Sequence, residues 1–436
     1  MNAKIFIGLG EVAGYYSSLK HGFDELGVPC DLVFVRDHPF GYNCNSYKGL
    51  MFSLLRIVAR RADQVNSNLK RILILLENII QIIWSIYVII RYDYFIFSFG
   101  RTFWPGNLDL PLLKLLGKKA IVNIAHGSDA RPPFMDGFLL NRMPHDPILT
   151  DYIYKISKRK SKKIDFILKN AFAVIGSPMS TSPFATKSFI NTFYVGAPFR
   201  PTELINYECD YDKKYKVLEE KSLVIVHAPS SPVAKGTEHI EYIVNNLISE
   251  GYDIDFRLLK NMTNSEVISV LASCDILVDQ MYSDTPMSGV ATEAAYYGKP
   301  SVVGGYGFGT LADVVAPQVW PPSMTCQPEE MYDTIRYMIE NKPEREAIGL
   351  RAQSFVKSHR SPVNVAKNYL RILKNETPDH WRFNPDEFIY WEGAGQSRAE
   401  IKKIIKALLT EYTSSGLFLD KVRPLTKKIL SEVNYN

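Results

Sequence analysis

The sequence has few cysteines and no paired-cysteine motif. Its 436 residues contain five, Cys30, Cys44, Cys209, Cys274 and Cys326, which stand far apart. Disulfide frameworks and zinc sites use closer, paired spacings. The odd count and the spacing therefore predict free thiols in a reducing compartment, and no metal site.

The chain also lacks strong signals for secretion or for binding nucleic acid. The first residues, MNAKIFIGLG, enter a strand pattern at once, so we expect no signal peptide. A net charge of +5 is a mild excess that does not by itself indicate a nucleic-acid partner. We expect a cytoplasmic protein. The length suits two domains of ordinary size, and a hydrophobic fraction of 46% suits a large core.

The loop after the first predicted strand does not match the fingerprint of a nicotinamide-dinucleotide site. Residues 4–8 predict a strand, residues 15–26 a helix and residues 31–35 a second strand, which is a Rossmann-like βαβ unit. The intervening loop spaces Gly8, Gly10 and Gly14 as GxGxxxG rather than GxGxxG. Two interpretations stay open, a tight structural turn and a ligand loop.

The stretch from Asp275 to Gly305 carries the clearest chemistry. It predicts a buried strand at 276–278, a loop of small residues, a helix that ends at Gly298, and another strand at 301–303. At the start of that helix, backbone N–H groups can bind a phosphate; they belong to Ser288, Gly289 and Val290.

Glu293, in the same helix, is acidic and cannot hold the phosphate. A carboxylate beside a phosphate site is suited to accept hydroxyl groups of a ribose or a sugar.

Two further loops follow predicted strands. After the strand at 223–226, Lys235 and Gly236 combine a point charge with free N–H groups, which favours phosphate binding. After the strand at 120–124 comes His126-Gly-Ser-Asp129-Ala-Arg131, at the end of a parallel strand where α/β sheets place ligand groups. A lone histidine is more often a structural hydrogen-bonding residue.

The run from Glu293 to Pro300, EAAYYGKP, resembles the motif of the retaining nucleotide-sugar glycosyltransferases of family 4. This resemblance implies the GT-B fold, an α/β architecture of two Rossmann-like domains facing each other across a cleft. It implies sugar transfer from a nucleotide-diphosphate sugar to a hydroxyl acceptor, with retention, without a metal or other cofactor, in polysaccharide biosynthesis. The expected domains are residues 1–198 on the acceptor side, 199–375 on the donor side, and a helical tail at 376–436 that packs back on the first domain.

The resemblance also implies roles for particular residues. His126, Glu293 and Lys235 would be catalytic. The donor would contact Ser230, Lys235, Gly236, Asp284, Thr285, Ser288, Gly289, Val290 and Glu293, and the cleft or acceptor side would include Gly10, Gly14, Asp129 and Arg131.

The sequence departs from the family pattern at two positions. Thr285, beside Asp284, stands where the family often has a second glutamate, and Ser230 stands where it often has an arginine. Arg257, Lys260 or another residue would have to supply the missing charge. These departures keep open a non-catalytic GT-B partner subunit, and a nucleotide-sugar epimerase of the same fold is a further alternative.

Metal-dependent transferases of another class need an Asp-x-Asp triplet at the carboxyl end of a strand. The triplets at 210–212 and 253–255 are poorly placed for that role, since one lies in a polar stretch and the other opens a strand.

Two segments leave a membrane partner open. Residues 48–92 predict helix, and Ile72–Ile90 within them is almost entirely apolar. Lys155–Lys169 is strongly basic. The apolar run is either a helix of the first domain or an in-plane contact with an anionic membrane, and the basic run is either a solvated helix face or a site for such a membrane or a lipid-linked acceptor. The expected partners are thus a nucleotide sugar, a glycan or lipid-linked acceptor, and an anionic membrane surface at the inner face of the membrane.

Overall fold

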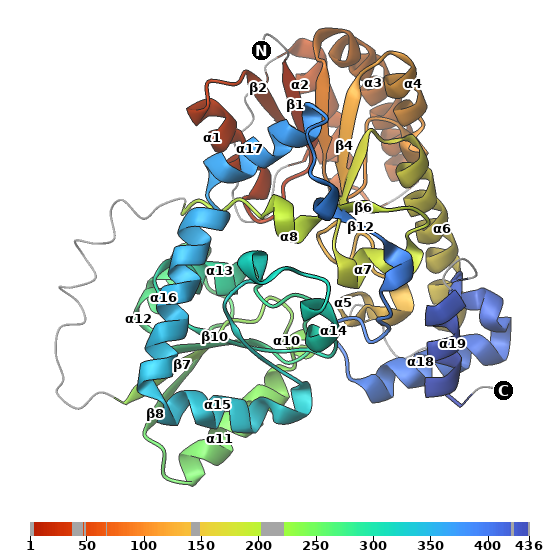
Figure 1. Cartoon of the computed structure of the whole chain (residues 1–436). Coiled ribbons are helices and arrows are strands. Elements are labelled where there is room, and N and C mark those ends of the chain that lie inside the picture. Colours follow the sequence, from red (N-terminus) through yellow and green to blue (C-terminus); the bar gives the residue numbers. More distant parts are fainter. Residues whose placement is uncertain are drawn as a thin grey trace. The chain divides into compact units, whose positions relative to one another are not determined.

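The chain forms two compact units, one with a mostly parallel β-sheet and one with a parallel β-sheet (Figure 1). The computed structural model describes residues 4–36, 47, 49–66, 68–140, 149–201, 222–419 and 423–434. The first unit comprises residues 1–130, 158–199 and 361–387, and the second comprises 131–157, 200–360 and 388–436. Two Rossmann-like α/β domains are therefore present, as the sequence predicts.

The first sheet has seven strands in the order β12-β6-β5-β4-β3-β1-β2. The strands are β1 Ile5–Leu9, β2 Cys30–Phe34, β3 Tyr94–Phe97, β4 Lys119–Asn123, β5 Ala173–Gly176, β6 Phe189–Asn191 and β12 Arg382–Phe383. Neighbours run parallel except β12, which pairs antiparallel with β6. Because β1 lies between β2 and β3, the strand order reverses at β1.

Helices pack on this sheet through apolar faces. Those of the first unit are α1 Tyr15–Glu25, α2 Leu50–Gln64, α3 Asn68–Arg91, α4 Asp109–Leu115, α7 Pro178–Thr181, α8 Thr192–Val195 and α17 Pro362–Leu373. Helix α6, Leu149–Asn170, is divided between the units: its residues up to 157 belong to the second unit and those from 158 to the first. The region predicted as helical, residues 48–92, contains two helices, α2 and α3. Gly22 of α1 packs so closely on α17 that a Cβ there would lie 2.1 Å from the Pro362 carbonyl oxygen.

The second sheet has five parallel strands in the order β11-β10-β9-β7-β8. They are β7 Leu223–His227, β8 Ile254–Leu258, β9 Ile276–Gln280, β10 Ser301–Gly304 and β11 Met324–Cys326. Its unit also contains α5 Gly137–Leu140, α10 Pro232–Lys235, α11 Thr237–Ser249, α12 Asn264–Ser273, α13 Gly289–Tyr296, α14 Phe308–Ala312, α15 Met331–Glu340, α16 Lys342–His359, α18 Arg398–Tyr412 and α19 Arg423–Glu432.

The units differ from the domain ranges expected from the sequence, because two segments belong to the other unit. Residues 361–387 belong to the first unit, where α17 packs on α1 and β12 extends the sheet. Residues 131–157 belong to the second unit, together with the tail from residue 388. There the Tyr154 and Tyr412 rings stack at 4.1 Å. Part of the C-terminal region thus joins the first unit, while α18 and α19 do not.

Three cysteines, Cys30, Cys274 and Cys326, are buried free thiols, as predicted, and Cys44 and Cys209 lie outside the described residues. Burial raises the pKa of the Cys30 and Cys274 thiols to about 12, so neither is a nucleophile near neutral pH.

Candidate functional site

Each sheet has one point where the strand order reverses, and the candidate residues gather there. In the second sheet, β7 lies between β8 and β9. Ligands of open α/β sheets bind beyond the carboxyl ends of the strands at such a point. The segments that follow β7 and β9 contain Lys235, the last residue of α10, and Glu293 of α13, which the sequence predicted as donor-site residues.

A backbone hydrogen bond joins these two loops. The Met281 N–H donates to the Lys235 carbonyl oxygen at 2.9 Å. Gly236 has a φ of 70°, and a Cβ there would lie 2.5 Å from the Met281 Cβ. Glycine is therefore required at this position, both for its backbone conformation and for the close approach of the β9 loop.

Lys235 forms a buried ion pair that the sequence did not indicate. Its Nζ lies 3.0 Å from Oδ1 of Asp279 on β9, with side-chain exposures of 8% and 0%. Oδ2 of Asp279 has no hydrogen-bond partner among the described residues. A buried carboxylate normally needs such pairing, so Asp279 balances the charge of Lys235.

The N-terminus of α13 is open to an anion. Ser288 is its N-cap residue, and Thr292 donates the first intrahelical N–H, to the Ser288 carbonyl oxygen at 2.9 Å. The N–H groups of residues 289–291 therefore have no acceptor within the helix. Within the described part of the chain, the buried Ser288 hydroxyl also has no partner. These groups together suit a phosphate.

Glu293 lies one turn further along α13, at the place the sequence predicts. Its Oε1 accepts a hydrogen bond from Asn264 Nδ2 at 3.0 Å. Burial raises the pKa of its carboxyl group, while Asn264 and the nearby charge of Lys235 oppose that shift. A partly desolvated carboxylate with one amide partner keeps capacity to accept hydroxyl groups of a ligand.

Arg131 belongs to the second unit, and its expected role on the cleft or acceptor side stays a prediction. Its guanidinium lies 2.5 Å from Asp284 and 3.0 Å from Asp136, and its side chain is 4% exposed. Asp284, expected to contact the donor, is thus held in an ion pair. The backbone N–H and carbonyl of Thr285 both bond the Ser283 hydroxyl, which fixes this loop.

An arginine far along the chain supplies charge near α13 that sequence reasoning missed. Arg360, directly after α16, donates to the Thr292 hydroxyl and, at 3.3 Å, to the Met287 carbonyl oxygen. Ser230 is exposed, and Arg257 pairs with Asp255 at 2.5 Å. No local motif marks Arg360, because only the tertiary fold brings it beside the loop.

In the first unit, the glycine-rich loop closes on one of its own side chains. The Glu11 carboxylate accepts hydrogen bonds from the backbone N–H groups of Val12, Tyr16 and Ser17, at 2.7–3.0 Å. It occupies the N-terminus of α1, where a Rossmann dinucleotide site would place pyrophosphate. Gly14, with a φ of 78°, is the N-cap residue. The loop therefore functions as a structural turn at this helix.

His126 lies beside that turn. Its Nε2 is 3.0 Å from the Tyr16 hydroxyl, and Phe99 packs against its ring. Burial lowers the pKa of His126 to about 4, so the ring is neutral at physiological pH. It can exchange hydrogen bonds with hydroxyl groups without carrying a charge.

Asp129 lies next to two lysines of α6. Burial raises the pKa of Asp129 to about 7, against the opposing charges of Lys160 and Lys163. Lys160 donates to the Ser128 carbonyl oxygen at 2.8 Å, and Lys163 to the Phe99 carbonyl oxygen at 3.1 Å. Part of the basic face of α6 is therefore turned to this loop rather than to solvent.

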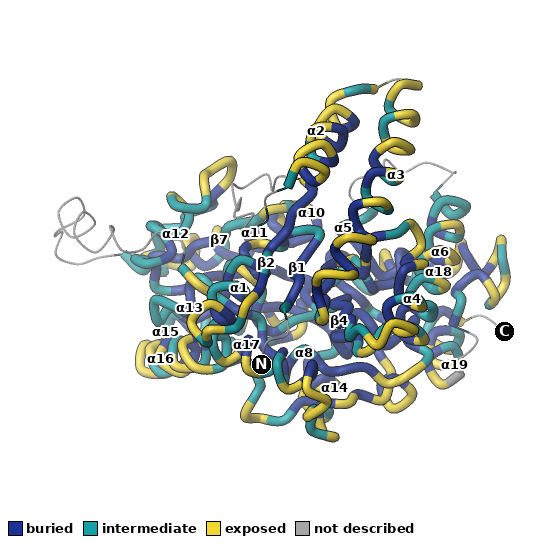
Figure 2. The backbone as a smooth tube through the Cα atoms, turned by 90° about the horizontal axis from the view of Figure 1, so that it is seen from above, coloured by how far each residue is buried: buried dark blue, intermediate teal, exposed yellow. Residues whose placement is uncertain are grey.

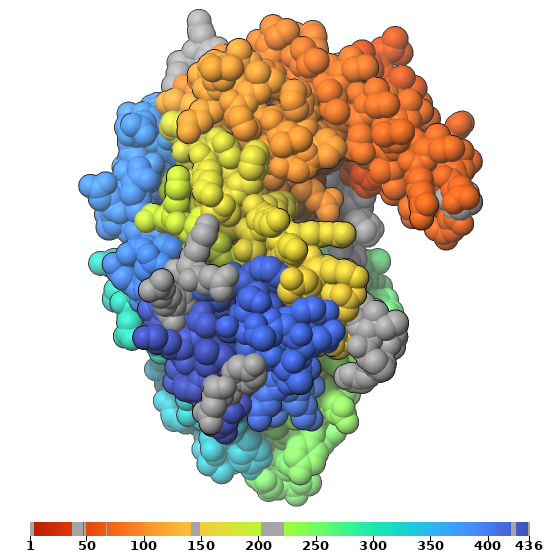
Figure 3. All heavy atoms as spheres, turned by 90° about the vertical axis from the view of Figure 1, so that its right-hand side faces the viewer, coloured from red at the N-terminus to blue at the C-terminus, as the bar shows by residue number. Residues whose placement is uncertain are grey.

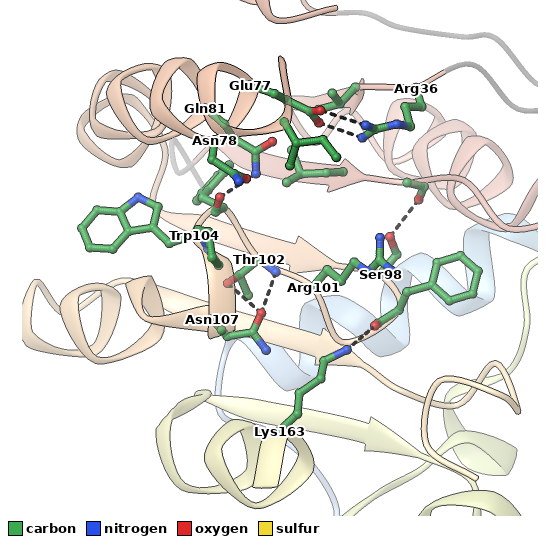
Figure 4. Close-up of a pocket in the computed structure, with 18 of the residues that line it drawn as sticks. Arg36, Glu77, Asn78, Gln81, Ser98, Arg101, Thr102, Trp104, Asn107 and Lys163 are labelled. Carbon is green, nitrogen blue, oxygen red and sulfur yellow. Dashed lines mark hydrogen bonds and ion pairs between the residues drawn. The ribbon is translucent and has the colours of Figure 1, made fainter. Parts of the chain in front are cut away.

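A cavity of about 730 Å³ opens at the reversal point of the first sheet (Figure 4). Its wall includes Gly10, whose carbonyl oxygen accepts a hydrogen bond from Ser98 at 2.9 Å. Arg101 and Lys163 also line it, and burial together with the charge of Arg101 lowers the pKa of Lys163. Its acidic lining residues are already engaged, Glu77 with Arg36 and Glu11 with backbone N–H groups. The two cations therefore favour a ligand that carries negative charge.

No group of three or more His, Cys, Asp or Glu residues placed to hold a metal ion occurs in the described ranges. Of the two Asp-x-Asp triplets, residues 210–212 lie outside the described residues, and Asp255 of the other pairs with Arg257.

Comparison with known proteins gives distant structural likenesses. No family model and no curated protein matches the sequence. The catalytic domain of starch synthase IV from Arabidopsis thaliana, bound to ADP and acarbose, has a TM-score of 0.46 and 9% identity, over 86% of this chain and 99% of that one.

Two further solved structures have similarly low TM-scores and identities. Anabaena HepE with UDP and glucose has a TM-score of 0.42 and 11% identity, over 86% and 100% of the two chains. A candidate UDP-N-acetylglucosamine 2-epimerase from Listeria monocytogenes has a TM-score of 0.44 and 10% identity, over 87% and 99%. These likenesses are too distant to assign an activity.

Proposed function

We propose that this chain is a glycosyltransferase of the GT-B fold that moves a sugar from a nucleotide-diphosphate sugar to a hydroxyl acceptor. The observation that supports this most is the meeting of two loops at the reversal point of the second sheet. One loop brings Lys235 and the other brings the N-terminus of α13. A cation, free N–H groups and a carboxylate suit a diphosphate joined to a ribose.

The proposed roles follow from these contacts. Lys235 and the N–H groups of residues 289–291 bind the diphosphate and stabilise its negative charge as the sugar leaves. Arg360, beside the same loop, adds the positive charge that Ser230 cannot provide. Glu293 accepts ribose hydroxyl groups, and the neutral His126 contacts the transferred sugar. Retention, independence of metals and membership of family 4 are parts of the same proposal.

The acceptor site is proposed to be the cavity of the first unit. Since Arg101 and Lys163 line it, an acceptor with a phosphate or carboxylate group would be favoured. A glycan with an acidic group and a lipid-linked sugar phosphate both satisfy this requirement. The proposed location is the cytoplasmic face of a membrane.

A nucleotide-binding screen tests the proposal. Thermal shift and hydrolysis are measured with UDP-, GDP-, ADP- and CMP-sugars, with and without EDTA. We expect the sugars of one nucleotide to stabilise the chain and to be hydrolysed slowly, both with and without EDTA. The absence of stabilisation by any of them would contradict a donor site. Loss of release in EDTA would contradict the metal-independent mechanism.

A non-catalytic GT-B subunit remains a second candidate, because Asp279 already balances the charge of Lys235. Binding of a nucleotide sugar without hydrolysis or transfer would favour it. Proton NMR of the incubated nucleotide sugar would also detect epimerisation, the remaining alternative.

A further inference from the structure

The α2–α3 hairpin carries an unusual share of exposed apolar side chains. More than half of the exposed large hydrophobic residues in the described chain lie between residues 50 and 90, about a tenth of the sequence. Exposed residues alternate with buried ones along both helices (Figure 2). In Figure 3 the hairpin, coloured orange, stands out from the rest of the first unit. Concentrations of this kind mark interaction surfaces.

Five of the exposed apolar residues of α3 form one continuous stripe. Leu75, Ile79, Ile83, Ile86 and Ile90 follow one another at spacings of three or four residues and are 46–75% exposed. Residues at these spacings share one face of a helix. The stripe extends for about 22 Å, at 1.5 Å per residue.

The opposite face of α3 is attached to the first unit. Glu77 pairs with Arg36 at 2.7 Å, and Gln81 donates to the Phe103 carbonyl oxygen. The Trp84 ring packs against Phe103 at 5.9 Å. By length and composition α3 could cross a membrane. However, crossing would break these contacts and bury Glu77 in hydrocarbon without Arg36, so only the outer face of α3 is available.

Charge distinguishes a lipid surface from a second copy of the chain. Arg60, Arg61, Lys70 and Arg71 lie near the connection between the helices. The acidic Asp63 and Glu77 both pair with Arg36. In a symmetric dimer through this face, the same cations would meet one another, which is unfavourable. Anionic headgroups would instead be attracted to them.

Helix α6 is a weaker candidate for this contact. Lys155 and Lys169 pair with Asp151 and Asp165 on the same helix, and Lys160 and Lys163 bond backbone carbonyl groups. We propose that the α2–α3 hairpin lies in the surface of an anionic membrane, with its apolar stripe in the acyl chains and its arginines and lysines among the headgroups. This inference assigns a lipid surface, and it does not depend on the proposed sugar transfer.

Flotation with vesicles tests the inference. Vesicles of phosphatidylcholine with and without phosphatidylglycerol are mixed with the full chain and with the triple variant Ile79→Gln/Ile83→Gln/Ile86→Gln. We expect the wild type to float with anionic vesicles, and the variant to bind at least about tenfold more weakly. Charge removal by Arg61→Gln/Arg71→Gln should weaken binding to anionic vesicles only, as should high salt.

Two matched controls accompany these variants. Leu115→Gln/Leu350→Gln replaces similarly exposed apolar residues elsewhere, at 83% and 65% exposure, and should leave flotation unchanged. Circular dichroism should show that all variants are folded, because every changed position is exposed. Neutralising Lys158 and Lys162 of α6 should also have no effect.

A depth measurement gives an independent readout. The Ile83→Trp variant should show more quenching of tryptophan fluorescence by brominated lipid than the wild type. Equal quenching, or flotation of the triple variant at the wild-type level, would overturn the inference. Size-exclusion chromatography could instead show a dimer that only the triple variant loses, with no binding to vesicles. That result would identify a second copy of the chain, and not a membrane, as the partner of the hairpin. Nucleotide binding by the triple variant is measured separately, so failure of the proposed function would be recognised on its own.

Discussion

Replacement of Lys235 by methionine separates the structural role of this lysine from its proposed ligand role. In the wild type, Lys235 and Asp279 form an ion pair in which both residues are buried. The Lys235→Met variant removes one charge and leaves the other without its partner. Breaking a buried pair in this way costs about 3–5 kcal/mol.

The expected fall in thermal stability is large. At roughly 2–4 °C per kcal/mol for a unit of this size, the midpoint of the transition of the second unit should fall by roughly 6–20 °C. Loss of a hydrogen bond to a charged ligand costs about 1.5–3 kcal/mol, so nucleotide-sugar affinity should fall by roughly 10–150-fold.

A double variant distinguishes the two effects. Lys235→Met/Asp279→Leu removes both charges, and apolar replacement of a buried pair is often neutral or stabilising. Differential scanning calorimetry should therefore show recovery of the midpoint, while isothermal titration with the nucleotide sugar should show that affinity stays low. The control Lys342→Met, from an exposed pair with Glu346 at 3.8 Å, should change neither quantity. Wild-type affinity in a stable double variant would refute the ligand role of Lys235.

Three further predictions concern other parts of the molecule. Glu293→Gln, which weakens the hydroxyl acceptor, should raise the donor Kd by about tenfold in calorimetry, with little change in stability. Asp129→Asn should raise the melting midpoint near pH 8 more than near pH 4. The pKa of Asp129 is about 7 in the folded chain and about 3.9 when unfolded, so the wild type loses stability as the pH rises between these values. Gly393→Ala should destabilise the second unit by more than about 1 kcal/mol in urea unfolding, since φ is +66° and a Cβ would lie 2.0 Å from the Met135 carbonyl oxygen.

Each of these has a result that would count against it. An unchanged donor Kd in Glu293→Gln, matched to that of the exposed control Glu238→Gln, would remove Glu293 from the site. A pH-independent difference between Asp129→Asn and the wild type would contradict the raised pKa. Stability of Gly393→Ala equal to that of Gly309→Ala, where a Cβ meets nothing within 4 Å, would contradict the close packing at Gly393.

Much of the secondary structure could be predicted because its patterns are local. The apolar runs at β1, β7 and β9, and the glycine that follows α13, mark elements with the bounds expected to within a few residues. The same patterns predict where the candidate ligand-binding residues lie, because parallel strands place their carboxyl ends at one edge of the sheet. Lys235 and Glu293 are therefore found at the same point of the sheet.

Tertiary partners could not be predicted in this way. The pairing of Lys235 with Asp279, the place of Arg360 beside α13, and the transfer of residues 131–157 to the second unit all depend on contacts between distant segments. The Glu11 carboxylate at α1 is closer in sequence, but a glutamate before a helix has many other available conformations. Its direction is fixed by the hydrogen bonds that it accepts from the start of α1.

The Glu11 carboxylate has a consequence for how many nucleotides the protein can carry. Both units have a helix that begins at the reversal point of a sheet, and each such N-terminus attracts one anion. In the first unit this anion is the Glu11 carboxylate, which is part of the chain. A phosphate could bind at the N-terminus of α1 only by displacing it. The expected stoichiometry is therefore one nucleotide per chain, although the architecture contains two Rossmann-like halves.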